Sequence, residues 1–175
     1  MITSWFALQV RVRMELKVSA LLQAKGYEEF LPLRRCNSTR SAAEPLFAGY
    51  VFCRFGPQAF GRFLTTPGVI RIVSFGGRPA PVDAEEIAAL QMVDKARLLA
   101  SPCEEFHIGN KVRIEQGPLR GVCGILSSIR GQSRLLISIH ILMRTVAVEV
   151  RPEWVSKLGG AQIAAPAGAG AGTWM

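Results

Sequence analysis

A change in hydrophobic periodicity near residue 105 is the feature that most constrains the fold of this chain. After it, Val112 and Ile114 alternate with charged neighbours, and the segments 135–141 and 145–150 alternate in the same way. Alternation with a period of two is typical of half-buried strands, and glycines between such strands indicate the turns of a small barrel. Because roughly 50 residues provide only a small core, an open sheet would leave exposed edges, and we expect the strands to close on themselves.

The residues before this point show mixed periodicity. The aromatic and β-branched stretch "SWFALQVRV" predicts a strand, and the helical spacing of Met14, Val18 and Leu22 predicts an amphipathic helix after it. We expect an aromatic strand over Leu46–Phe55 in "EPLFAGYVFCRFG". Asp83, with an acidic residue three positions later, is the expected N-cap of another helix. This order predicts an α+β domain in which helices cover a mostly antiparallel sheet.

The charge balance favours a polyanionic neighbour. The formal net charge is +8, and residues 106–158 hold eight basic and three acidic residues, so the barrel carries most of the excess. No apolar run approaches the roughly 20 residues that span a bilayer, and the first residues lack the basic and apolar regions of a secretory signal. We therefore expect a cytoplasmic protein that has no membrane partner.

The sequence predicts neither a catalytic site nor a metal site. Its four cysteines, Cys36, Cys53, Cys103 and Cys123, are far apart without a C-x-x-C pair, and only two histidines could add ligands. It contains no recognisable Ser/His/Asp or Cys/His set, no phosphate-binding glycine loop before a helix and no paired carboxylates in a known frame. These features indicate a protein that is not an enzyme and that needs no cofactor.

The stretch "IGNKVRIEQGPLRGVCGIL" is the most specific motif of the chain. A glycine opens a strand, a Gly-Pro turn follows it, and two further glycines lead into the next strand. Glycine at such corners allows a positive φ or a close backbone approach. The register of these residues resembles the KOW motif, which occurs in NusG-type transcription factors and in some ribosomal proteins. The resemblance implies an SH3-like barrel.

The first domain independently resembles the same family. Trp5, "EPLFAGYVF" and "TPGVIRIVSFGGRPAPV" are similar to the N-terminal domain of NusG, and "EPLF" and "FGGRPAPV" are closer to the specialised RfaH and UpxY types. One departure is Ala48, where many members have proline. The resemblance covers about residues 3–158 and implies a polymerase-binding domain at 1–98 and a KOW domain at 106–158. Pro102 and the acidic pair after it indicate a linker at 99–105, and the low-complexity composition of residues 159–175 predicts a disordered Gly/Ala-rich tail.

In this family an apolar patch of the N-terminal domain binds the coiled-coil clamp helices of the largest subunit of bacterial RNA polymerase. The resemblance therefore assigns polymerase contacts to Gln9, Lys17, Phe47, Tyr50 and Phe52. Tyrosine suits such a surface, because its ring is apolar and its hydroxyl can form a hydrogen bond. The alternative is that the aromatic residues only form the core.

Two groups of arginines are candidates for contact with nucleic acids. By charge and family placement, Arg11, Arg13 and Arg62 are expected to approach the non-template DNA strand. In the barrel, Arg120, Arg130 and Arg134 lie at predicted turns, where they can meet RNA phosphates or an acidic protein surface. The alternative for the second group is a solvated face of the barrel.

Together these features imply a monomeric transcription elongation and antitermination factor. Such a factor bridges the polymerase clamp, suppresses pausing and termination, and recruits Rho or a ribosomal protein through its barrel near the nascent RNA. We favour an operon-specific role, since "EPLF" and "FGGRPAPV" resemble the specialised members. The alternative is a KOW-containing RNA-binding protein that acts in ribosome assembly or translation. Refolding of the C-terminal segment into helices that mask the polymerase site, as in RfaH-like members, stays open.

Overall fold

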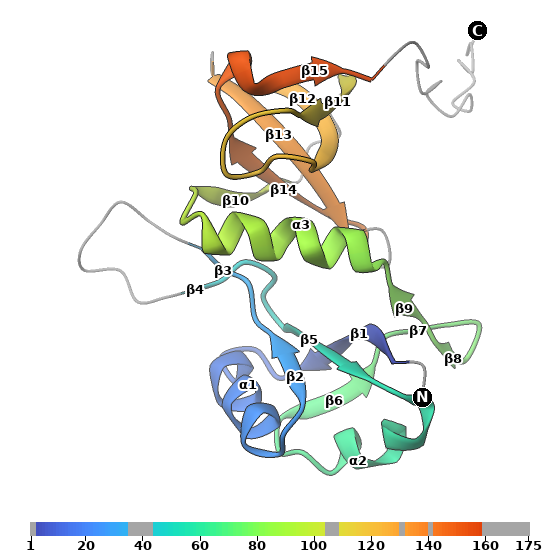
Figure 1. The fold of residues 1–175 in the computed structure, drawn as a ribbon. Helices are drawn as coiled ribbons and strands as arrows, with labels where there is room; N and C mark the ends of the chain where they lie inside the picture. Colours follow the sequence, from blue (N-terminus) through green and yellow to red (C-terminus); the bar gives the residue numbers. More distant parts are fainter. Residues whose placement is uncertain (1–2, 35–43, 104–108, 130–131, 140–141, 159–175) are drawn as a thin grey trace, which may run out of the picture.

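The computed structural model describes residues 3–34, 44–103, 109–129, 132–139 and 142–158 (Figure 1). The predicted Gly/Ala-rich tail at 159–175 and Arg130 lie outside these residues. Two larger antiparallel sheets and a few helices make up the described chain, which confirms the predicted α+β class. In the part of the chain that the structure describes, no helix is long and apolar enough to cross a membrane.

The N-terminal sheet is built around β1 (Ser4–Val10), with the strand order β2-β5-β1-β6 and β9 as a further partner of β1. The other strands are β2 (Glu28–Phe30), β5 (Tyr50–Phe55), β6 (Val69–Ile72) and β9 (Pro81–Val82). β1 and β5 are antiparallel, with Ala7 opposite Phe52 and Leu8 opposite Val51. Aromatic and β-branched side chains fit a pleated surface of this kind, and here both of its sides are covered.

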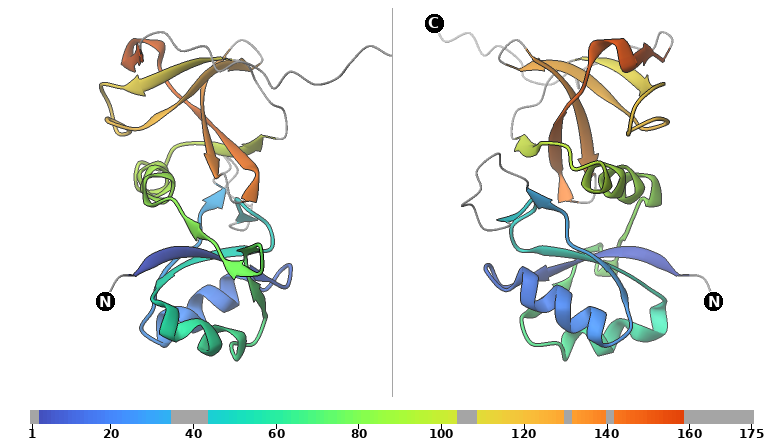
Figure 2. Two further views of the ribbon diagram at one scale, coloured as in Figure 1. Left: turned by 90° about the vertical axis from the view of Figure 1, so that its right-hand side faces the viewer. Right: turned by 60° about the vertical axis from the view of Figure 1, so that its left-hand side comes forward.

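Alternate side chains of the two central strands enter two different hydrophobic clusters. The helices are α1 (Glu15–Ala24), α2 (Phe60–Leu64) and α3 (Ala84–Lys95). Leu8 and Val51 pack with residues of α1 and α2. Ala7 and Phe52 belong to the second cluster, which includes residues of α3. Figures 1 and 2 show α1 and α2 on one side of the sheet and α3 on the other.

A local sequence signal explains where α3 begins. Asp83 is the N-cap of α3, because its Oδ1 accepts a hydrogen bond from the Glu85 backbone N–H at 2.8 Å, as predicted. α1 begins at Glu15 without a side-chain cap, and Gly26 follows its end with a φ of 78°. A single 3₁₀ turn begins at Pro57 and leads directly into the short α2.

The strand predicted over Leu46–Phe55 begins only at Tyr50, so the first part of that prediction was wrong. The segment 46–49 is a turn, in which the Tyr50 backbone N–H donates to the Phe47 carbonyl at 3.1 Å. Gly49 has a φ of 81°, a left-handed conformation that is incompatible with a continuous strand. The aromatic pattern runs through this turn unchanged, which is why periodicity did not reveal it.

Two short ladders extend from the N-terminal sheet. β3 pairs with β4, and β7 pairs with β8 through a two-residue glycine loop. Their bounds are β3 (Leu33–Arg34), β4 (Glu44–Pro45), β7 (Ser74–Phe75) and β8 (Arg78–Pro79). The first ladder leads into the turn at 46–49, so it places that turn at the start of β5.

The C-terminal sheet has the strand order β10-β14-β13-β12-β11-β15 among the described residues. Its strands are β10 (Ala100–Cys103), β11 (Asn110–Ile114), β12 (Cys123–Ile129), β13 (Gln132–Ile139), β14 (Arg144–Glu149) and β15 (Val155–Lys157). Val112, Ile114, Val146 and Val148 are buried, as the alternation predicted. β10 lies in the segment predicted as a linker and pairs with β14. β10 and β15 are the two ends of the order, so this pairing does not by itself close the expected barrel.

α3 lies between the two sheets (Figures 1 and 2). One hydrophobic cluster contains Trp5 and Phe52 of the N-terminal sheet, Leu90 of α3, and Leu135 and Ile137 of β13. The C-terminal sheet therefore packs on the side of the N-terminal sheet that α1 and α2 leave uncovered.

Candidate functional site

Three of the predicted contact residues lie on one face of the N-terminal sheet. Gln9 of β1 is directly opposite Tyr50 of β5, and Phe52 follows two residues later on the same face. Arg71 of β6 is opposite Gln9 from the other side, and its Nε donates a hydrogen bond to Gln9 Oε1 at 2.7 Å. Tyr50, Gln9 and Arg71 thus form a row across three strands.

Phe47 reaches the same face from the turn that precedes β5. Its ring packs edge-on against Phe52, with centroids 5.9 Å apart, and Phe52 stacks near Phe30 at 6.4 Å. Phe47 and Phe52 are buried, whereas Gln9 and Tyr50 are half-buried. The structure therefore brings four predicted residues together, Gln9, Phe47, Tyr50 and Phe52, which we call the Tyr50 face.

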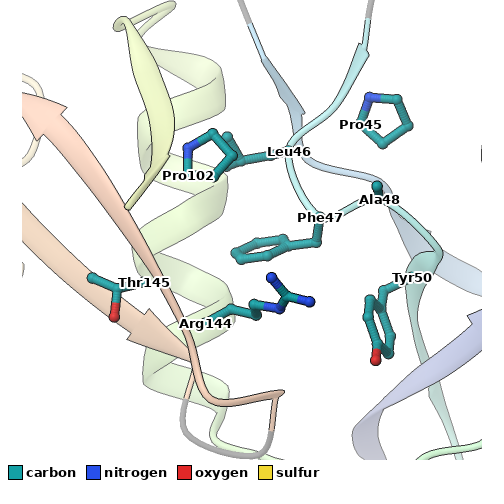
Figure 3. Close-up of a pocket in the computed structure, with 8 residues that line it drawn as sticks. All are labelled: Pro45, Leu46, Phe47, Ala48, Tyr50, Pro102, Arg144 and Thr145. Atoms are coloured by element: carbon teal, nitrogen blue, oxygen red, sulfur yellow. The ribbon is translucent and has the colours of Figure 1, made fainter. Parts of the chain in front are cut away.

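A pocket of about 240 Å³ lies between the Tyr50 face and the C-terminal sheet (Figure 3). It is lined by Pro45, Leu46, Phe47, Ala48, Tyr50, Pro102, Arg144 and Thr145. Figure 3 shows the side chain of Arg144, from the start of β14, extending toward Phe47 and Tyr50. The C-terminal sheet thus borders the Tyr50 face and covers part of it.

Lys17 does not belong to the Tyr50 face. It is exposed on α1, and α1 packs through Val18 and Leu22 on the opposite side of the N-terminal sheet. The sequence-based assignment grouped Lys17 with Tyr50, and the structure does not bring the two residues together.

The first group of candidate arginines lies on the N-terminal part of the molecule. Arg11 and Arg13 are exposed in the turn between β1 and α1, and Arg62 is exposed on α2. Arg13 has a left-handed backbone, with a φ of 71°. Arg11 and Arg13 thus directly precede α1, and Arg62 is part of α2, the two helices that cover one side of the sheet.

The second group of arginines is only partly where the sequence placed it. Arg120 is exposed in the turn after β11, as predicted. Arg134 was expected at a turn, and this placement was wrong: it lies within β13, opposite Glu149 of β14. Its Nη2 is 3.8 Å from Glu149 Oε2. The hydrophobic alternation in the sequence begins at Leu135, so the strand was expected to begin there. In the structure β13 already begins at Gln132, and Arg134 is paired within it.

Sequence reasoning missed two residues at this site, Arg71 and Glu15. Arg71 becomes recognisable only when the pairing of β6 with β1 is known, because no local pattern links it to Gln9. Glu15 is buried, and its Oε1 accepts a hydrogen bond from the Gly49 backbone N–H at 2.7 Å. Its partner is distant in the sequence, so periodicity gave no signal for this contact.

Cys53, on the helix-covered face of β5, is not an activated nucleophile. Burial, followed by the negative charge of Glu29, raises the pKa of the Cys53 thiol to about 12. The thiol is therefore protonated at neutral pH, whereas a reactive cysteine needs a lowered pKa. In the ranges that the structure describes, no group of three or more His, Cys, Asp or Glu residues could hold a metal ion.

Comparisons with known proteins agree on one family. Residues 3–91 match the family model described as "NusG: Transcription termination factor nusG". The chain is similar to the transcription termination/antitermination protein NusG of Vibrio cholerae serotype O1, with 30% identity over 131 residues that cover 71% of each chain. It is 27% identical to the NusG of Borreliella burgdorferi over 150 residues, which cover 79% of this chain and 82% of the relative.

A solved structure extends the likeness beyond the matched family segment. The structure described as "Domain interaction in Thermotoga maritima NusG" aligns with a TM-score of 0.57 at 23% sequence identity. The alignment covers 91% of this chain and 99% of that one. At this identity the match concerns the fold, which the two chains share over both sheets.

Proposed function

The chain belongs to the NusG family of transcription termination and antitermination factors, and from this membership we propose that it binds RNA polymerase through the Tyr50 face. The four residues of that face contact the clamp helices of the largest polymerase subunit. A ligand that binds one conformation better than another shifts the population toward it. By binding the closed clamp, the protein favours elongation over the paused and terminating states.

The two-sided hydrophobic character of β5 is the observation that supports this proposal. One face of the strand is filled by the protein's own helices α1 and α2, against which Val51 and Cys53 pack. The other face carries Tyr50 and Phe52, with Phe47 beside them and a pocket in front (Figure 3). A half-buried tyrosine among buried aromatic rings is the kind of residue that dominates protein–protein interfaces.

The C-terminal sheet has to move before polymerase can use the whole Tyr50 face. The pocket has walls from both parts of the molecule, with Phe47 and Tyr50 on one side and Pro102 and Arg144 on the other. A clamp helix cannot contact Phe47 while Arg144 and its strand border it. In this proposal the described arrangement is the resting form, and polymerase binds a form in which the two parts have separated.

The exposed arginines complete the proposed mechanism. Arg11, Arg13 and Arg62 approach the non-template DNA strand, and Arg120 and Arg134 face RNA or an acidic partner surface once the C-terminal sheet is released. The sheet then recruits a second factor, Rho or a ribosomal protein. The connection to the polymerase-bound part raises the local concentration of that factor near the nascent RNA. We favour antitermination of selected operons as the outcome.

Retention of bacterial RNA polymerase core by the immobilised full-length protein tests the proposal. The Tyr50→Ala variant should retain at least about tenfold less polymerase than the wild type, because central aromatic residues carry most of the binding free energy. Phe75→Ala is the matched control: Phe75 is 82% exposed in β7, so this change removes an aromatic ring elsewhere on the N-terminal part. Circular dichroism confirms that each variant is folded.

Two results would contradict the proposal. Equal retention by wild type and Tyr50→Ala would show that the Tyr50 face is not the binding surface. No retention by either the wild type or residues 1–98 alone, in which the C-terminal sheet cannot cover the Tyr50 face, would argue against polymerase binding altogether and favour the RNA-binding alternative.

A further inference from the structure

Glu15 is a buried carboxylate to which the proposed mechanism has so far given no role. It is the first residue of α1, and its side chain is only 3% exposed. Its Oε1 accepts a hydrogen bond from the Gly49 backbone N–H at 2.7 Å. A buried carboxylate is costly unless it is hydrogen-bonded, and the first turn of a helix adds a favourable dipole. The position of Glu15 is therefore defined by its bond to Gly49.

Gly49 is held from two directions. Its N–H donates to Glu15, and its carbonyl accepts a hydrogen bond from the Val10 backbone N–H at 2.8 Å. These bonds tie the turn at 46–49 both to the end of β1 and to the start of α1. The φ of 81° at Gly49 is readily adopted only by glycine, so the turn has few alternative ways to meet the same two partners.

This turn determines where the aromatic residues of the Tyr50 face point. Phe47 lies within it, and Tyr50 follows it directly. The Tyr50 backbone N–H donates to the Phe47 carbonyl at 3.1 Å, which couples the two residues to one another. If the Gly49 N–H loses its acceptor, the turn is free to shift, and both aromatic rings shift with it.

We propose that Glu15 is a positioning residue for polymerase binding, which fixes the turn at 46–49 so that Phe47 and Tyr50 are presented on one face. The inference rests on the proposed function, since the Tyr50 face must bind polymerase for its orientation to matter. Glu15 touches no partner itself, because it is buried, and it acts through the Gly49 amide.

Side-chain length separates this role from a simple effect of charge. Asp keeps the charge at position 15 but is one methylene shorter, so its oxygens cannot reach the Gly49 N–H in the same geometry. Gln loses the charge but has the length of Glu and retains an acceptor oxygen. The pair Glu15→Asp and Glu15→Gln therefore distinguishes the hydrogen bond from the charge.

The experiment measures two quantities on the full-length protein. One is the exchange rate of the Gly49 amide hydrogen, followed by nuclear magnetic resonance, and the other is retention of RNA polymerase core. Glu15→Asp should speed Gly49 exchange and lower polymerase retention, each about tenfold, while Glu15→Gln should stay within about threefold of the wild type. Glu28→Gln is the control, because Glu28 is exposed and pairs only at the surface with Arg54, at 3.3 Å.

Each contrary result has a defined meaning. Wild-type retention by Glu15→Asp, despite faster Gly49 exchange, would overturn the positioning role. A loss in Glu15→Gln as large as the loss in Glu15→Asp would also overturn it, because the length and acceptor oxygen that Gln retains would then not be enough to position the turn. If neither the wild type nor residues 1–98 alone retain polymerase, the proposed function is wrong and the role of Glu15 in it falls as well. Polymerase retention by the unsubstituted protein thus separates a failure of the proposed polymerase binding from a failure of the positioning role of Glu15.

Discussion

At the scale of single residues, Arg13 combines an exposed guanidinium group with a strained backbone. Its φ of 71° lies in the left-handed region, which costs a non-glycine residue about 1–3 kcal/mol. It occupies the third position of a turn, closed by a hydrogen bond from the Met14 N–H to the Arg11 carbonyl at 3.0 Å. Glycine is the residue best suited to a positive φ at that position. An arginine there is consistent with a side chain retained for contact with nucleic acid.

Replacing Arg13 by glycine should therefore stabilise the protein and weaken its binding to single-stranded DNA. The free energy of unfolding should rise by about 0.5–1 kcal/mol, since relief of strain exceeds the entropy that glycine gains in the unfolded chain. Urea unfolding measures the first effect, and titration of a labelled oligonucleotide at fixed salt measures the second. The Arg13→Lys variant should change neither quantity appreciably. A loss of stability in Arg13→Gly would show that the backbone at this turn is not strained.

The residues of the candidate site differ in how far local sequence could predict them. Tyr50 and Phe52 were assigned from the family resemblance of the local stretch "EPLFAGYVF", and the structure places them on one face. Glu15 was not found, because its partner Gly49 is 34 positions away and the contact leaves no periodic signal. The burial of Phe47 beside Arg144 depends on the packing of the C-terminal sheet, which no local pattern encodes.

At the scale of elements, the start of a helix was predicted best where the sequence signal involves only neighbouring residues. Asp83 marked the start of α3, since the capping bond involves only neighbouring residues. β10 was read as a linker, because Pro102 and the acidic residues after it resemble a connection, whereas its strand character comes from pairing with β14. Long-range backbone pairing therefore defines elements that composition alone would assign to loops.

The turn between β11 and β12 offers a matched test of glycine chemistry. Gly117 has a φ of 81°, and a Cβ atom there would lie 2.9 Å from the ring of Trp154. Gly121 has a φ of 90°, but a Cβ atom there would meet open space. Both positions are strained for alanine, and only Gly117 adds a steric clash.

We expect Gly117→Ala to lower the free energy of unfolding by about 2–4 kcal/mol, and Gly121→Ala by about 1–2 kcal/mol. Urea titration followed by far-ultraviolet circular dichroism measures both values. The emission of Trp154 should also change in the first variant, because its ring has to move. Equal losses in the two variants would mean that the contact with Trp154 contributes nothing.

At the scale of the whole molecule, α3 joins the two sheets through one continuous hydrophobic cluster. Trp5 belongs to the N-terminal end of that cluster, and Trp154, in the 3₁₀ turn before β15, packs against it. A cluster that is shared in this way couples the unfolding of the two parts, unlike a pair of domains on a free linker.

The two parts should therefore unfold in one transition. Variants that keep Trp5 or Trp154 as their only tryptophan, with the others changed to Phe, report on each part by fluorescence. In each variant the urea midpoint from fluorescence should coincide with the midpoint from circular dichroism. Separate midpoints for the two signals would show that the C-terminal sheet unfolds independently of the N-terminal sheet.

β5 buries side chains on both of its faces, and this affects how the strand finds its alignment with β1. A shift by one residue would exchange Val51 and Cys53 with Tyr50 and Phe52 at little cost in apolar burial. In a strand with one polar face, the same shift would expose the apolar side chains to water and bury the polar ones, and both changes cost free energy. The alignment is therefore specified near the two ends of the strand, by the bonds of Gly49 at its start and by exposed Arg54 near its other end, which the shift would turn toward the helix-covered cluster. A substitution at the Gly49 corner would change which residues meet across the sheet, and not merely leave a hole in the core.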